Sequence, residues 1–250
     1  MSDEYILGTA TPDAIANLER LRQQASQTKT PVFDSTNKNN KMLFFAFDGT
    51  GDNKDNGSLG APSNVGRLFE SAQSGLRASS SGDAFYYKGP GTQDDPVSRV
   101  LDGATGMTVP QTVATAYQNL VEYANLNPDT ILSIGTTGFS RGAATARAFM
   151  NAVYEQGILD TSSRVSLGID PHTNEERFSY TKYLVEPHEA KLAVAMLYDT
   201  VATGVARDES LMRIPPVEGL KVYQLAVVGA MLEARRELSD FVPMLIRKEH

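Results

Sequence analysis

A serine between two glycines is the feature of this chain best suited to chemistry. The segment Gly138-Phe-Ser-Arg-Gly142 fits the pattern G-x-S-x-G, with a strand-like apolar run before it at 131–134 and a helix-forming run after it at 143–150. This strand–turn–helix context is typical of a nucleophile elbow, which holds a serine hydroxyl out at the carboxyl edge of a sheet. The glycines are needed because a Cβ in so tight a turn collides with the neighbouring strand or helix. The pattern predicts that Ser140 is a nucleophile and that the next N–H faces a developing oxyanion.

A serine nucleophile needs a base and an acid. The hydroxyl attacks only when a histidine takes its proton, and a carboxylate must orient that histidine. Hydrolases with this elbow place the three groups in the order serine, acid, histidine. Asp199 follows the apolar run 192–198 and satisfies the second position. A helix N-cap or an ordinary turn aspartate is the structural alternative for Asp199.

Histidines are scarce, and none lies where this order requires the base. The chain holds His172, His188 and His250. His188 precedes the strand-like run 192–198, so we expect it at the surface, at the amino end of that strand. His250 is the last residue. His172 lies within 160–188, a segment whose pattern is ambiguous, and it could act as the base only if this segment folded over the sheet edge.

A second loop could contribute to the same chemistry. Asp48-Gly-Thr-Gly51 follows the apolar run 41–47. Because Gly49 allows a substrate close to the backbone, we expect this loop to supply the second oxyanion donor, most simply the N–H of Thr50. The alternatives are a solvated turn and a metal site built with the nearby aspartates. The spacing does not fit a twelve-residue EF-hand loop, because no glutamate follows at the required position.

Arg141 directly follows the candidate nucleophile. Its planar guanidinium suits a substrate phosphate, to which it can donate two parallel hydrogen bonds. It could equally pair with Asp48 or form a salt bridge at the surface. The sequence leaves these three alternatives open.

The rest of the chain supplies the elements that must position these residues. The pattern predicts strands at 41–47, 85–88, 130–135 and 192–198, and helices at 63–76, 109–124, 143–156 and 220–238. Ser63 is the expected N-cap of the first helix and Gly157 the stop signal of the third. Apolar strands that alternate with helices favour an α/β fold with a mostly parallel sheet. Sites in such sheets lie beyond the carboxyl ends of the strands, so Asp48, Ser140 and Asp199 are expected at one edge.

The composition narrows the class of protein. The chain has 250 residues, of which 41% are hydrophobic and 21% charged, as in a globular domain. The net charge of −7 argues against nucleic-acid binding as the main role. The chain has no cysteine, which excludes disulfides and thiol catalysis, and no motif calls for a cofactor or a metal. It has neither an apolar run long enough to span a membrane nor the features of a secretory signal peptide.

Several short motifs occur in the order seen in a known family. They are Phe47-Asp-Gly-Thr-Gly51, Ser63-Asn-Val65, Tyr86-Tyr-Lys-Gly-Pro-Gly-Thr92, Gly103-Ala-Thr-Gly106, Gly138-Phe-Ser-Arg-Gly-Ala143 and Tyr198-Asp-Thr-Val201. Over residues 41–243 the chain resembles the catalytic domain of type VI secretion lipase effectors and their α/β-hydrolase relatives. The resemblance implies an α/β-hydrolase fold that hydrolyses acyl esters of membrane phospholipids. It makes residues 1–40 an N-terminal extension and 41–250 the catalytic domain.

The resemblance also implies roles and partners. By motif position Ser140 is the nucleophile, Asp199 the acid, and Asp48–Thr50 the oxyanion loop. It implies a toxin that is made in the cytoplasm and delivered into a rival bacterium. Its partners would be a phospholipid substrate at a membrane surface, a component of the secretion apparatus and a cognate immunity protein.

Two departures from the family's pattern concern the base. Gln224 falls where the family has a helix that begins with histidine. The family's triad histidine comes from a later G-x-H-S-D loop, and this chain ends at His250 before such a segment. We therefore expect the domain to lack its last strand and the chain by itself to be a weak or inactive enzyme. The alternative is a catalytically silent hydrolase-fold module that binds a partner or lipid.

Overall fold

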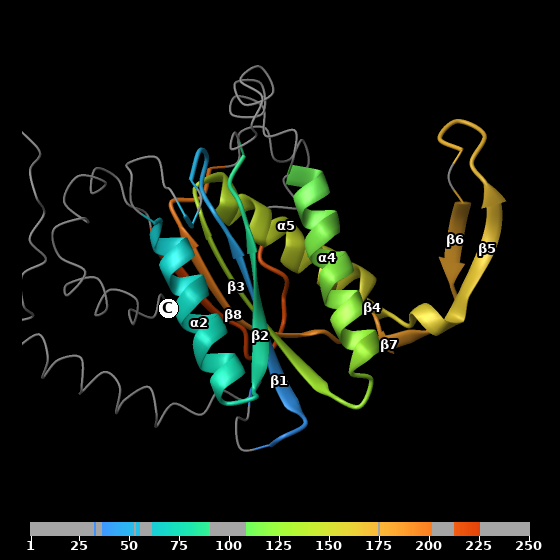
Figure 1. Ribbon diagram of the computed structural model, residues 1–250, viewed down its shortest axis with the longest axis horizontal. Coiled ribbons are helices and arrows are strands. Elements are labelled where there is room, and N and C mark those ends of the chain that lie inside the picture. The colour runs from blue at the N-terminus through green and yellow to red at the C-terminus, as the bar shows by residue number, and fades with distance from the viewer. Residues whose placement is uncertain are drawn as a thin grey trace, which may run out of the picture. The chain divides into compact units, whose positions relative to one another are not determined.

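The computed structural model describes residues 33, 37–52, 54–55, 62–90, 109–174, 176–201 and 213–225. These residues form a five-stranded parallel sheet with helices on both faces (Figure 1). The strands are β1 (Asn40–Phe47), β2 (Gly82–Tyr87), β3 (Ile131–Phe139), β8 (Lys191–Tyr198) and β9 (Lys221–Leu225). Their order is β2-β1-β3-β8-β9, and every neighbouring pair is parallel. The predicted α/β fold with a mostly parallel sheet is confirmed.

The ends of β1, β3 and β8 are aligned. The last residue of β1 is in register with Gly138, and the last residue of β3 is in register with Tyr198. Because the strands are parallel, the residue that follows each of them lies at the carboxyl edge of the sheet. Asp48, Ser140 and Asp199 are these three residues, as the sequence pattern predicted.

Helices cover the two faces of the sheet. Helix α2 (Asn64–Ala78) packs on one face, and helices α4 (Val109–Leu126) and α5 (Arg141–Gln156) pack on the other (Figure 1). Phe44 points toward α2, whereas Phe45 points toward α4 and α5, and their exposed fractions are 5% and 0%. Strand β1 is therefore buried on both faces, which explains its continuous apolar run.

Local sequence signals set the helix ends. The hydroxyl of Ser63 accepts a hydrogen bond from the N–H of Gly66 at 2.8 Å and caps α2. Such a cap contributes about 1 kcal/mol. Helix α5 ends before Gly157, whose φ of 65° lies in the region that favours glycine. For the first three predicted helices, the predicted bounds differ from the observed ones by at most two residues. Among the described helices, none combines the length and the apolar character needed to cross a bilayer.

The segment that the sequence pattern left unassigned forms two small antiparallel sheets. Strand β4 (Ile158–Leu159) pairs with β7 (Tyr183–Val185), and β5 (Arg164–Ile169) pairs with β6 (Glu176–Tyr180). A 3-10 turn at Thr161–Ser163 joins β4 to β5. The β5–β6 hairpin stands apart from the central sheet (Figure 1). Strands β4 and β7 have only two and three residues and are too short for hydrophobic periodicity to reveal them.

The helix predicted over 220–238 is wrong at its start. Residues Lys221–Leu225 form strand β9, in which Gln224 is in register with Leu197 of β8. A short apolar run does not distinguish a helix from a strand, and β8 supplies backbone hydrogen-bond partners that the sequence does not reveal. Gln224 therefore lies in a strand and not at the head of a helix. The rest of the prediction, 226–238, lies outside the described residues.

Candidate active site

The backbone of Ser140 adopts the conformation of a nucleophile elbow. Its φ of 54° and ψ of −120° are unusual for a residue with a side chain, and such strain is frequent at functional sites. The N–H of Ser140 donates to the carbonyl of Tyr198 at 2.9 Å, and the N–H of Val201 donates to the carbonyl of Ser140 at 3.2 Å. Hydrogen bonds with the last residue of β8 and with the segment after it therefore hold the strained turn between β3 and α5.

The flanking glycines leave room for this turn. A Cβ on Gly138 would lie 2.4 Å from the carbonyl oxygen of Gly142. A Cβ on Gly142 would lie 2.2 Å from the carbonyl oxygen of Phe47 and 2.4 Å from that of Asp48. These contacts are with backbone atoms, which cannot move aside cheaply. The steric reason that the sequence pattern predicted for both glycines is confirmed, and α5 starts directly against the end of β1.

The side chain of Ser140 is not used to cap helix α5. Ser140 occupies the N-cap position, where a serine usually accepts a hydrogen bond from an N–H of the first turn, but it makes no such bond. The residue is half-buried at the carboxyl edge. The first N–H groups of a helix have no partner within the helix, and they favour negative charge. The hydroxyl thus lies beside donors that could stabilise an oxyanion.

The loop after β1 is held in place by the segment after β2. The N–H of Gly51 donates to the carbonyl of Pro90 at 2.9 Å, and the N–H of Gly89 donates to the carbonyl of Asp52 at 3.1 Å. Thr50 lies at the exposed tip of the loop, and its N–H is not a donor in either of these two backbone bonds. The loop is therefore fixed on both sides of the residue that the sequence predicted as an oxyanion donor.

Asp48 is buried beneath this loop, with an exposed fraction of 1%. Its carboxylate accepts hydrogen bonds from the N–H of Gly49 at 2.9 Å, from the hydroxyl of Tyr86 at 2.5 Å and from the hydroxyl of Ser63. Burial raises the pKa of Asp48, and the three donors partly oppose this. Burial and the bond to Asp48 raise the pKa of Tyr86. Asp48 itself is therefore buried and hydrogen-bonded, whereas Thr50 and Gly51 of the same loop are exposed.

A metal site at this loop finds no support among the described residues. Within them, no three histidine, aspartate or glutamate side chains gather as metal ligands would. The oxygens of Asp48 instead accept hydrogen bonds from protein donors. The sequence analysis did not predict that Tyr86 and Ser63 donate hydrogen bonds to Asp48, although both residues belong to the short motifs quoted for the family. The pairing of β1 with β2, which sets Tyr86 opposite Ala46, is the signal that could have found the first.

Arg141 connects the elbow to the loop. Its Nε donates to the hydroxyl of Thr50 at 2.7 Å, and its exposed fraction is 6%. The surface salt bridge considered from the sequence is therefore wrong, because the side chain is buried. Two segments that are far apart in the sequence are tied together beside the candidate nucleophile.

Asp199 lies next to the elbow at the same edge. It follows β8, and the two hydrogen bonds of the Ser140 backbone reach residues on either side of it, Tyr198 and Val201. Its φ of 44° places it in the left-handed region, which aspartate tolerates better than most residues. The structure thus brings Ser140, Asp199 and the loop of Asp48, Gly49 and Thr50 to one edge.

The described histidines lie away from the elbow, His188 before the start of β8 and His172 in the turn of a hairpin outside the central sheet. His172 is exposed in the turn of the β5–β6 hairpin, whose base is tied to the end of α4 by a 2.9 Å hydrogen bond from the N–H of Thr161 to Asn125. The end of α4 precedes the start of β3, so the base of the hairpin is at the amino edge. His188 is exposed, and its Nε2 lies 3.1 Å from Glu155 at the end of α5. The structure does not bring His172 to Ser140, and His250 lies outside the described residues.

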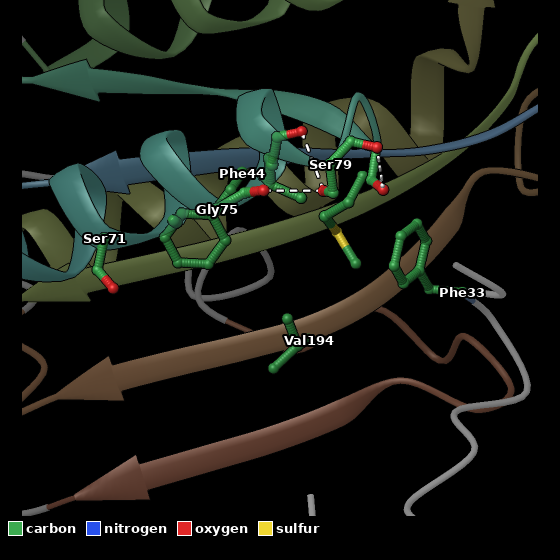
Figure 2. Close-up of a pocket in the computed structure, with 10 residues that line it drawn as sticks. Phe33, Phe44, Ser71, Gly75, Ser79 and Val194 are labelled. Carbon is green, nitrogen blue, oxygen red and sulfur yellow. Dashed lines mark hydrogen bonds between the residues drawn. The ribbon is translucent and has the colours of Figure 1, made fainter. Parts of the chain in front are cut away.

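An apolar groove lies on the α2 face, away from this site. Its volume is about 570 Å³. Figure 2 shows Phe33, Phe44 and Val194 around it, with Ser71, Gly75 and Ser79 contributed by α2 and its end. The hydroxyl of Ser79 donates to the carbonyl of Gly75 at 2.8 Å. The groove is next to the amino halves of β1 and β8.

The fold and the elbow together define a class. A parallel sheet with helices on both faces and a strained serine between β3 and α5 in a G-x-S-x-G turn are features of an α/β-hydrolase. Residues 41–214 match the family described as "T6SS, Phospholipase effector Tle1-like, catalytic domain". The chain belongs to this family of type VI secretion phospholipase effectors.

Two solved structures are similar to this chain. A crystal structure of an uncharacterized protein from Pseudomonas aeruginosa is 16% identical with a TM-score of 0.43, over 87% of this chain and 39% of that chain. The structure of the Tle1 effector bound to the VgrG spike from the type 6 secretion system is 19% identical with a TM-score of 0.34, over 79% of this chain and 46% of that one. This chain spans less than half the length of either. No curated protein matches the sequence.

Proposed function

We propose that this chain is a catalytic domain that hydrolyses acyl esters of membrane phospholipids, with Ser140 as its nucleophile. The observation that carries the proposal is the strained backbone of Ser140 at a half-buried strand end, with a side chain that does not cap its helix. Membership of a phospholipase effector family supplies the substrate class. The family also motivates the proposal of a toxin that acts in another bacterium.

The proposed mechanism is acyl transfer through the serine. Oγ of Ser140 attacks the ester carbonyl, its proton passes to a histidine, and the carbonyl oxygen becomes an oxyanion. The N–H groups of Arg141 and Thr50 stabilise that oxyanion. The alcohol portion leaves with the proton, and water then releases the fatty acid from Ser140. Asp199 orients the histidine, which the described residues do not supply at this edge.

The proposed partners follow from the family. Type VI effectors are delivered by a secretion apparatus, and the similar solved effector is bound to a VgrG spike. We infer a partner in that apparatus and an immunity protein that covers the site in the producing cell. Co-purification of this chain with a VgrG spike protein and with a candidate immunity protein from the producing cell tests both partners, and absence of both complexes contradicts them.

A serine-directed probe tests the catalytic role. A fluorophosphonate should label the wild-type chain at Ser140, as located by mass spectrometry, and Ser140→Ala should abolish labelling. Ser71→Ala, a change at an exposed serine of α2, serves as the matched control and should label normally. The wild-type chain and Ser71→Ala should release fatty acid from phosphatidylcholine and phosphatidylethanolamine vesicles. Ser140→Ala should release none.

The same experiment distinguishes the proposed enzyme from a second candidate function, a catalytically silent module that binds a partner or lipid. The structure places neither described histidine beside Ser140, since His172 lies in the β5–β6 turn and His188 beside Glu155, and this observation favours a silent hydrolase-fold module. Such a module would show no labelling and no fatty-acid release, while it still bound a partner or lipid. Labelling at another serine would contradict both proposals.

A further inference from the structure

An oxyanion hole at this edge has to be assembled from two separate segments. One donor is the N–H of Arg141 at the start of α5, and the other is the N–H of Thr50 in the loop after β1. Donors act only when they lie within a few tenths of an ångström of the position that the oxyanion takes. Something must therefore fix the loop to the elbow.

The side chain of Arg141 makes this connection. It leaves the elbow, is buried to 6% exposure, and donates from Nε to the hydroxyl of Thr50 at 2.7 Å. Thr50 itself is exposed at the tip of the loop. A hydrogen bond from a cationic donor is roughly twice as strong as one between neutral groups. The two residues that would provide the oxyanion donors are thus bonded to each other through their side chains.

A second contact holds the loop to the elbow. A Cβ on Gly49 would lie 2.4 Å from Cδ1 of Phe139, so the ring of Phe139 lies directly against the backbone of the loop. Phe139 directly precedes Ser140. The residues on either side of Ser140 therefore both hold the loop. Phe139 packs against it, and Arg141 donates a hydrogen bond to it.

We propose that Arg141 is a positioning residue whose side chain, through Thr50, sets the spacing between the two oxyanion donors. The inference rests on the proposed function and adds a residue to it. Because the side chain is buried, it acts on Thr50 and not on the phosphate of the substrate. A lysine cannot reproduce the bond, since it lacks the planar Nε–H that meets the threonine hydroxyl.

A double-mutant cycle on a soluble ester tests the proposal without membrane binding. With 4-nitrophenyl butyrate, Arg141→Met and Thr50→Val should each lower kcat by about 10- to 100-fold, less than the loss of a whole donor. KM should stay within about twofold, because the oxyanion forms only in the transition state. The double variant should be no slower than the slower single variant. Thr50→Ser, which keeps the hydroxyl, should recover most of the kcat lost in Thr50→Val.

The control is Arg77→Met, which removes an arginine that pairs with Asp83 at the surface and should leave kcat unchanged.

Amide hydrogen exchange of the full chain gives a readout that needs no activity. The Gly51 N–H, bonded to Pro90, should exchange faster in Arg141→Met, while the amides of α4 should not change. Multiplicative losses in the double variant, or a change confined to KM, would overturn the inference. An inactive, unlabelled wild-type chain would instead overturn the proposed function.

Discussion

The hydroxyl of Tyr86 donates a 2.5 Å hydrogen bond to the buried carboxylate of Asp48 across the β1–β2 pair. Asp48 uses its other oxygen to accept the N–H of Gly49, and Ser63 reaches the same carboxylate from the cap of α2. One side chain thus joins the end of β1, strand β2 and helix α2. The carboxylate fixes the start of the loop that Arg141 holds at its tip.

Removal of the Tyr86 hydroxyl should destabilise the fold. Tyr86→Phe leaves a buried carboxylate with one donor fewer, and the expected loss in the free energy of unfolding is about 1–3 kcal/mol. Tyr87→Phe is the matched control, because the partner of its hydroxyl is the neutral amide of Asn119, which donates to it at 2.8 Å. Urea denaturation measures both variants. A larger loss in Tyr87→Phe than in Tyr86→Phe would contradict the role given to Asp48.

The free energy of unfolding should also depend on pH in the way expected for a buried aspartate. Burial raises the pKa of Asp48 above the ordinary 3.8, with a further contribution from Asp52. A carboxyl group whose pKa is raised in the folded state stabilises the fold at low pH and loses that contribution as the pH rises through the folded-state pKa. The free energy of unfolding of the wild type should therefore fall relative to that of Asp48→Asn as the pH increases above 3.8.

Asp160 provides a control of opposite sign. Hydrogen bonds from the side chain and the backbone N–H of Ser162 lower the pKa of Asp160. The wild type should gain stability relative to Asp160→Asn as the pH rises through the region below 3.8, and the gain should be complete above it. Chemical denaturation over a pH series measures both differences. Parallel curves for the wild type and Asp48→Asn would contradict the assignment.

A methyl group at Gly142 should disturb the elbow. Its carbon would lie 2.2 Å from the carbonyl oxygen of Phe47, so either β1 or α5 must shift. We expect Gly142→Ala to cost about 1–3 kcal/mol and to lower fluorophosphonate labelling. Gly75→Ala is the matched control, because it lies in α2 with open space around it. That change should stabilise the protein by about 0.5–1 kcal/mol, and thermal unfolding should show the two opposite shifts.

Asp199→Asn should separate the charge of Asp199 from its backbone conformation. Asparagine tolerates the left-handed region as aspartate does, so the φ of 44° should be kept and the melting temperature should change little. Loss of the carboxylate should lower kcat by about 10⁴-fold if it orients a histidine. Steady-state hydrolysis and calorimetry together measure this. Full activity in Asp199→Asn would remove it from the mechanism.

The sequence predicted the sheet edge well because the signals there are local. Glycine, serine and aspartate at the ends of apolar runs indicate tight turns. Backbone sterics and local hydrogen bonding then account for the elbow, for the cap at Ser63 and for the end of α5 at Gly157. Strand β3 runs on to Phe139, beyond the predicted end at 135, because Gly135, Thr136 and Thr137 interrupt the apolar pattern without interrupting the pairing with β1 and β8.

Three features were decided by contacts between distant segments. Strand β9 forms because β8 offers its backbone to residues 221–225, which by themselves suit a helix. Tyr86 meets Asp48, and Arg141 meets Thr50, only because the register of β2, β1 and β3 brings them together. Burial, which makes Asp48 a structural anchor and keeps Arg141 from the surface, is a property of the packed molecule. The sequence by itself determined which residues could react and where the chain turns, since both depend on neighbouring residues, whereas the tertiary structure alone decided which of them meet.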